Sequence, residues 1–177
     1  AGYLILLAPH SQAEAQALGG IMPPDARTRV AIPHSGAVPY ILYGDSHAGQ
    51  YRAAISARFG SGALLTENAC LAAEGLSNWE PGSAEGDNCI AMTDALVETV
   101  SARKVPVVIW AQRWDRPLFD AGSGAALGES GKAAAPALIN AINRTIARLP
   151  RETRVVIIGN SPTAWAAGPL MQQGWLR

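Results

Sequence analysis

The sequence has no excess of charge of either sign. Fourteen lysine and arginine residues balance fourteen aspartate and glutamate residues, and charged residues make up only 16% of the 177 residues. A protein that captures a polyanion usually presents an excess of basic residues on one face. The balance therefore argues against a nucleic acid or an anionic membrane surface as the partner.

Motifs for metals, nucleotides and membrane insertion are also missing. The two cysteines and three histidines show no zinc-ligand spacing, and no phosphate-binding glycine motif occurs. We therefore expect no cofactor and no metal. The apolar run at residues 3–8 is too short to span a membrane, and it lacks the basic flank and cleavage site of a signal peptide.

Apolar residues, by contrast, make up 49% of the chain, which suits one globular domain with a buried core. Strands are expected at residues 38–43, 63–66, 105–110 and 155–158. Helices are expected at residues 51–59, 89–103 and 133–149. Loops are expected at residues 19–35, 67–88 and 112–131.

This alternation of strands and helices predicts right-handed βαβ crossovers. We therefore predict an α/β fold: a three-layer α/β/α sandwich around a mostly parallel, flavodoxin-like sheet. Residues 1–177 would form a single domain, with residues 1–36 as an N-terminal flank and residues 37–177 as the core.

The two cysteines, Cys70 and Cys89, are compatible with one disulfide or with two buried thiols. The segment between them is rich in glycine, serine, asparagine and proline, so a covalent link would restrain an otherwise loose stretch. We favour the disulfide, and with it an oxidising compartment outside the cytoplasm.

Ser46 is the candidate nucleophile. The apolar run at residues 38–43 ends at Gly44, and Asp45, Ser46 and His47 precede a helix-compatible segment. A strand that turns at a glycine into a helix places one side chain at the carboxyl edge of a sheet, where open α/β folds hold their ligands. Backbone N–H groups at a helix start also suit a developing negative charge. The tripeptide alone is equally typical of an ordinary turn or helix cap.

The segment at residues 43–48, Tyr-Gly-Asp-Ser-His-Ala, resembles the first sequence block of the SGNH hydrolases, also called the GDSL family. The Gly-Asp-Ser-His variant is most similar to the SGNH domain attached to acyltransferase-3 membrane proteins, which O-acetylate bacterial surface polysaccharides. The resemblance implies the SGNH fold and an acyl-serine intermediate on Ser46. It also implies an acyl donor and a carbohydrate acceptor as substrates, an upstream acyltransferase-3 membrane domain in the parent protein, and a periplasmic location.

The same resemblance suggests donors for an oxyanion. SGNH enzymes usually carry Gly-x-Asn-Asp after the third strand, whereas residues 110–114 here are Trp-Ala-Gln-Arg-Trp, similar to the acyltransferase-linked branch. Gln112 and Arg113 are the candidates in this loop, the alternative being that Arg113 pairs with Asp115. Asn68, after the second strand, is a further candidate.

One motif of the family is missing. SGNH enzymes take their proton acceptor from a late Asp-x-x-His motif, and no such motif occurs in this sequence. Neighbouring side chains on a turn diverge, so Asp45 and His47 are expected to bind substrate or the oxyanion and not to act on Ser46. We favour a domain truncated at Arg177, with its catalytic Asp and His beyond that residue. A free-standing carbohydrate esterase and a catalytically incomplete carbohydrate-binding domain are the alternatives.

Overall fold

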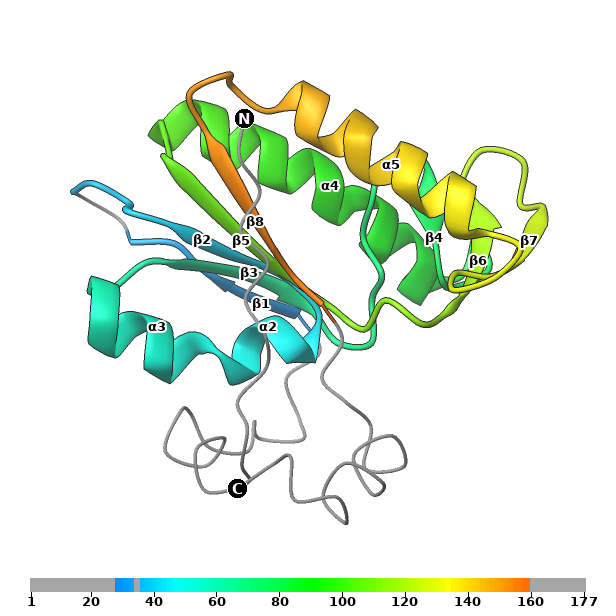
Figure 1. The fold of residues 1–177 in the computed structure, drawn as a ribbon, viewed down its shortest axis with the longest axis horizontal. Helices are drawn as coiled ribbons and strands as arrows, with labels where there is room; N and C mark the ends of the chain where they lie inside the picture. Colours follow the sequence, from blue (N-terminus) through cyan, green and yellow to red (C-terminus); the bar gives the residue numbers. More distant parts are fainter. Residues whose placement is uncertain (1–27, 34–35, 160–177) are drawn as a thin grey trace, which may run out of the picture.

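The computed structural model describes residues 28–33 and 36–159. Most of the predicted flank, residues 1–36, and the expected truncation at Arg177 lie outside these residues. A five-stranded sheet forms the centre of the described structure (Figure 1). Its strands in spatial order are β1 (Thr28–Ala31), β3 (Ala63–Glu67), β2 (Ile41–Gly44), β5 (Val107–Ala111) and β8 (Arg154–Ile158).

The pairing of these strands is mostly parallel. Strand β1 runs antiparallel to β3, and the β2–β3, β2–β5 and β5–β8 pairs are parallel. The predicted α/β fold with a mostly parallel, flavodoxin-like sheet is therefore confirmed. Strand β1 was not expected, because it lies in a segment predicted as a loop and forms only by pairing with the edge of β3.

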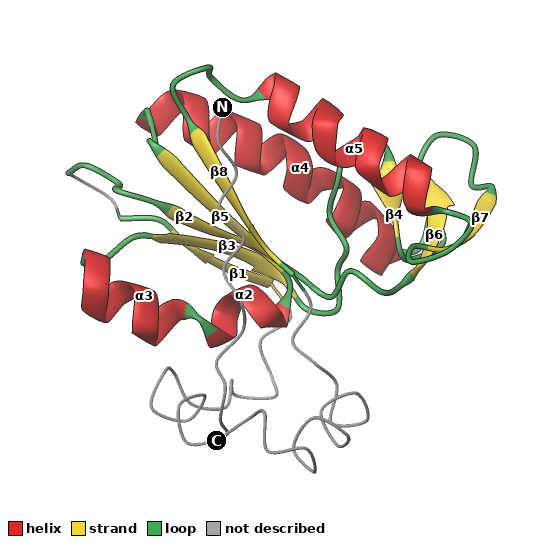
Figure 2. Ribbon diagram, in the orientation of Figure 1, coloured by secondary structure: helices red, strands yellow, loops and turns green. Residues whose placement is uncertain are grey.

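Helices cover both faces of the sheet and complete three layers (Figure 2). One face carries α2 (Ser46–Gln50) and α3 (Arg52–Phe59), and the other carries α4 (Ala84–Arg103) and α5 (Ala135–Arg148). Tyr43 and Trp110 pack beneath α4 and α5 with ring centroids 5.3 Å apart, whereas Leu42 and Ala111 pack beneath α2 and α3. Strands covered on both faces need no polar alternation, which is why their sequences are continuously apolar.

Two helical segments begin earlier than their apolar patterns indicate. The helix expected at residues 89–103 begins at Ala84, because the hydroxyl of Ser83 accepts a hydrogen bond from a backbone N–H of the first turn and caps it. The helix expected at residues 51–59 is preceded by α2, whose first residue is Ser46. The candidate nucleophile therefore lies within a helix and not in the turn before it.

The segments predicted as long loops contain a second, smaller sheet. Its antiparallel strands are β4 (Leu76–Ser77), β6 (Pro117–Asp120) and β7 (Ala126–Glu129). Strands of two to four residues are too short for an alternating pattern to stand out in the sequence. This sheet lies beyond one end of α4 and α5 (Figure 1).

The favoured disulfide is present. Cys70, directly after β3, is joined to Cys89 in α4, with a Cα–Cα distance of 5.5 Å. Both residues are buried. The link closes a ring of chain that contains β4 and fastens the loop after β3 to the helix that covers the sheet.

Candidate active site

The carboxyl ends of the parallel strands lie at one edge of the sheet. Gly44, the last residue of β2, is in register with Thr66 of β3 on one side and with Ala111 of β5 on the other. The residues that follow β2 and β5 are therefore neighbours. The structure thus brings together residues 45–47 and 112–113, which are separate in the sequence and were both predicted to belong to the site.

Gly44 permits the turn that presents the candidate nucleophile. Its φ is +134°, a conformation that L side chains rarely adopt. A Cβ at this position would lie 1.9 Å from the carbonyl oxygen of Ala111. Both the backbone conformation and the close approach of β5 therefore require glycine.

Asp45 connects the two loops through its side chain, which is only 1% exposed. Its Oδ1 accepts a hydrogen bond from the backbone N–H of His47 at 2.8 Å and caps α2. Its Oδ2 accepts a hydrogen bond from the backbone N–H of Arg113 at 3.0 Å. The Nδ1 atom of His47 lies 3.0 Å from Oδ1. One buried carboxylate therefore holds the turn after β2, the His47 ring and the loop after β5.

Ser46 begins α2 and is partly exposed. Asp45, and not Ser46, caps the helix, so the serine hydroxyl has no role in ending the strand or starting the helix. Within the part of the chain that the structure describes, no side chain is hydrogen-bonded to this hydroxyl. Ser46 therefore lies, partly exposed, at the carboxyl edge of the sheet.

Arg113 contacts the site through its backbone. Its guanidinium pairs with Asp115, with Nε 2.9 Å from Oδ1, and both side chains are about half exposed. The hydrogen bond between them is the main cause that raises the pKa of Arg113 and lowers the pKa of Asp115. The pairing with Asp115 that the sequence left open is the one seen here.

Gln112 is buried at the end of β5. Its Oε1 accepts a hydrogen bond from the backbone N–H of Ala72 at 3.1 Å, which ties the loop after β3 to β5. Its Nε2 is buried and has no hydrogen-bond partner among the described residues. A backbone N–H donates to an oxygen and not to an NH₂ group, so this bond also determines which side-chain atom of Gln112 is Oε1 and which is Nε2.

The loop after β3 is braced by its own side chains. The carbonyl oxygen of Ala69 accepts hydrogen bonds from Asn78 Nδ2 at 2.9 Å and Trp79 Nε1 at 3.2 Å. Asn78 Oδ1 also accepts from the backbone N–H of Leu71 at 2.6 Å. This role could not be predicted from the sequence, because asparagine is common in turn-rich segments. Asn68, the predicted donor, is exposed at the start of the loop.

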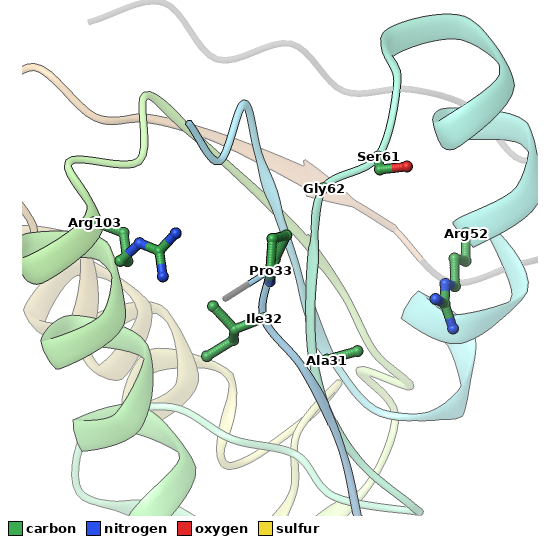
Figure 3. A pocket seen from close by; sticks show the side chains of 7 residues that line it. All are labelled: Ala31, Ile32, Pro33, Arg52, Ser61, Gly62 and Arg103. Carbon is green, nitrogen blue, oxygen red and sulfur yellow. The ribbon is translucent and has the colours of Figure 1, made fainter. Parts of the chain in front are cut away.

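A hollow of about 730 Å³ lies at the opposite edge of the sheet (Figure 3). It is lined by the end of β1 and the start of β3, with Arg52 and Arg103 on its two sides. Arg103 donates a hydrogen bond to the carbonyl oxygen of Gly36 at 3.0 Å, so this side chain helps to hold the chain before β2. The hollow is separate from Ser46.

The described part of the chain contains no metal-binding cluster and no membrane-spanning helix. No group of three or more histidine, cysteine, aspartate or glutamate side chains is arranged there to hold a metal ion. No helix in these ranges is long and apolar enough to cross a membrane.

Comparison with known proteins identifies the family. A family model described as "SGNH domain (fused to AT3 domains)" matches residues 19–175. No curated protein and no solved structure gives a significant match. The matched residues include the turn at Ser46, the loop after β5 and all the described strands and helices. The chain therefore belongs to the family of SGNH domains that are fused to AT3 domains.

Proposed function

We propose that Ser46 is the nucleophile of an O-acyl transfer to a hydroxyl group of a bacterial surface polysaccharide. Ser46 Oγ would form an ester with the acyl carbon, an acetyl group or a similar one, as the bond to the acyl donor breaks. The polysaccharide hydroxyl would then form its own ester as the serine ester breaks. In the first step, a base takes the serine proton and passes it to the leaving group of the acyl donor. In the second step, the base takes the proton of the polysaccharide hydroxyl and passes it to Ser46 Oγ.

The observation that carries this proposal is the placement of Ser46. It begins a helix at the carboxyl edge of the sheet, and its neighbour Asp45 caps that helix in its place. A serine that served only as a cap would use its own hydroxyl for the hydrogen bond. Membership of the SGNH family, which suggests esterase or acyltransferase activity, supports the same role.

The hydrogen bonds that the candidate groups already form reduce the number of possible donors to the oxyanion. The N–H of His47 is occupied by Asp45, so the N–H of Ser46 is the proposed backbone donor. Among side chains, Asn68 is exposed at the same edge and is the proposed partner. Arg113 would have to leave Asp115 to contribute its guanidinium, and Gln112 would contribute the buried Nε2 that has no partner in the described structure.

The family and the disulfide support a proposed location and a proposed partner. SGNH domains of this family are fused to AT3 domains, so the proposed partner is an upstream acyltransferase-3 membrane domain in the parent protein. The Cys70–Cys89 disulfide supports an oxidising compartment on the periplasmic side. An acyl group delivered there would reach a carbohydrate acceptor that is already outside the cytoplasm.

One observation favours a second candidate function. No described side chain is hydrogen-bonded to the hydroxyl of Ser46, and the sequence has no Asp-x-x-His motif. A catalytically incomplete SGNH domain that binds carbohydrate without turnover would have this arrangement. A carbohydrate esterase would use the same serine and differ only in that water accepts the acyl group.

A fluorophosphonate probe, which reacts with activated serines, tests the nucleophile. The intact protein, Ser46→Ala and Ser101→Ala are each treated and weighed by mass spectrometry. Ser101 is an exposed serine in α4 and is the matched control. One adduct that persists in Ser101→Ala and is lost in Ser46→Ala supports the proposal. The absence of an adduct on the unmodified protein, treated at the full length of the parent protein, contradicts acyl transfer and favours the carbohydrate-binding domain.

A further inference from the structure

We propose that Asp45 and His47 form a preorganised binding site for the substrate hydroxyl group. In this site, His47 Nε2 accepts the hydrogen bond that the hydroxyl group donates. Asp45 would be the positioning residue and His47 the residue that touches substrate. This inference rests on the proposed function of Ser46 and specifies which of its two substrates lies against His47.

The carboxylate of Asp45 cannot rotate without losing hydrogen bonds. Backbone N–H groups face both of its oxygens, that of His47 at 2.8 Å from Oδ1 and that of Arg113 at 3.0 Å from Oδ2. These donors belong to two different loops, each fixed to a strand of the sheet. The carboxylate is also shielded from water, since only 1% of the side chain is exposed. Asp45 is therefore a fixed point against which a ring can be oriented.

This fixed point determines the proton position on the His47 ring. Both Asp45 oxygens already act as acceptors toward N–H groups, so the contact of 3.0 Å with Nδ1 is a hydrogen bond that Nδ1 donates. In a neutral imidazole, one nitrogen donates and the other accepts. Nε2 therefore carries the lone pair. The side chain is 28% exposed, so the ring reaches the surface while Nδ1 faces the buried carboxylate.

A lone pair at Nε2 selects one class of ligand. It accepts a hydrogen bond from a hydroxyl group, whereas a carboxylate or phosphate oxygen brings no proton to donate. The acyl donor presents its carbonyl to Ser46, and the acceptor presents a hydroxyl. His47 is therefore assigned to the acceptor, a neutral polyol such as a sugar.

The absence of a hydrogen bond between the side chains of His47 and Ser46 fits this assignment. In the transfer step, the attacking hydroxyl oxygen approaches the acyl carbon on Ser46 to about 3–3.5 Å. A ring on the adjacent residue needs to reach this incoming oxygen and not Ser46 Oγ. Adjacent side chains on a helix diverge, which leaves room for a hydroxyl group between them.

The first test measures how an acylated Ser46 divides its acyl group between water and an alcohol. p-Nitrophenyl acetate is the acyl donor, and methyl β-glucopyranoside is the acceptor probe. Release of p-nitrophenol reports acylation, and the ratio of sugar ester to acetate reports transfer. We expect His47→Ala to lower this ratio about five- to tenfold, the value of one hydrogen bond of roughly 1–1.5 kcal/mol.

Two further variants control this experiment. Gln50→Ala changes an exposed residue at the other end of α2 and should keep the unmodified ratio. His47→Gln retains a side-chain acceptor oxygen and should recover part of the ratio lost in His47→Ala. The inference would be overturned if His47→Ala left the ratio of sugar ester to acetate unchanged. It would also be overturned if the variant lowered p-nitrophenol release and sugar-ester formation by the same factor.

A second measurement does not depend on Ser46 being reactive. Proton–nitrogen correlation NMR identifies which imidazole nitrogen of neutral His47 carries the proton. We expect Nδ1 to be protonated, and Asp45→Asn to abolish this preference. A proton on Nε2 would overturn the inference even if Ser46 forms an acyl-enzyme. Absence of acylation with Nδ1 protonated would instead overturn the proposed function and leave the oriented ring as a site for hydroxyl groups.

Discussion

Replacement of Asp45 by asparagine tests whether the buried carboxylate holds the two loops together. The substitution keeps the size and shape of the side chain and turns one acceptor oxygen into an NH₂ group. In one orientation, the NH₂ group faces the backbone N–H of Arg113. In the other, it faces the backbone N–H of His47. One hydrogen bond is therefore lost in either case, and two donors face each other out of reach of water.

The cost can be worked from these contacts. A hydrogen bond to a charged group contributes about 1.5–3 kcal/mol, and a buried donor left without a partner costs a further amount of about 1–3 kcal/mol. Because these two terms overlap, we expect the free energy of unfolding to fall by roughly 2–4 kcal/mol. With a urea m-value of about 2–3 kcal/mol/M, the unfolding midpoint would fall by about 1 M or slightly more.

Equilibrium unfolding in urea, followed by circular dichroism, measures this change. The matched control is Asp94→Asn, because Asp94 is 72% exposed and forms an ion pair with Arg148. That exposed pair should contribute less than about 1 kcal/mol. If Asp45→Asn changes the midpoint no more than Asp94→Asn does, the carboxylate does not hold the loops and the reasoning is refuted. A changed m-value would show that the variant no longer unfolds in the same way.

Three further substitutions test other parts of the structure. Gly44→Ala should prevent folding, because its Cβ would lie 1.9 Å from a carbonyl oxygen of β5 at a φ of +134°; a thermal midpoint equal to that of the unmodified protein would contradict this. Replacing Cys70 and Cys89 together by serine should lower the free energy of unfolding by about 2–4 kcal/mol. Dithiothreitol should lower the free energy of unfolding of the unmodified protein to that of this variant. Equal free energies of unfolding for the two proteins before reduction would contradict the prediction. Arg113→Ala should cost less than about 1 kcal/mol in unfolding measurements, since its guanidinium pairs only with an exposed carboxylate. A larger loss would mean that the side chain, and not the backbone N–H, holds this loop.

The sequence predicted those features that depend on local patterns. The apolar run before Gly44 and the glycine itself indicated the strand and its turn, and they placed Ser46 at the carboxyl edge of the sheet. The central strands could be recognised because both of their faces are buried, which makes them apolar throughout. The Cys70–Cys89 pair could be favoured because the segment between them has few residues that would hold it in place.

The rest depends on contacts that leave little trace in the sequence. Arg113 was selected for its guanidinium, but it meets Asp45 through a backbone N–H that any residue except proline could supply. Gln112 was predicted as a donor to the oxyanion, and the sequence did not indicate that it is buried or that its Oε1 braces the loop after β3. The strands β6 and β7 are short and form by pairing with each other and with β4. Tertiary pairing of this kind sets secondary structure without any local periodicity.

The disulfide also predicts a difference in local stability between the two sheets. The small sheet contacts α4 through β4, and the covalent ring closed by Cys89 contains β4. Reduction should therefore loosen the small sheet more than the parallel sheet, which is held by its own ladders. In hydrogen exchange, the rates of the β6 and β7 amides should rise after reduction by a larger factor than the rates of the β2 and β5 amides. The loop after β5 connects this strand to β6 and lies next to the turn that contains Ser46. Reduction of the disulfide would therefore affect a loop that neighbours the candidate nucleophile.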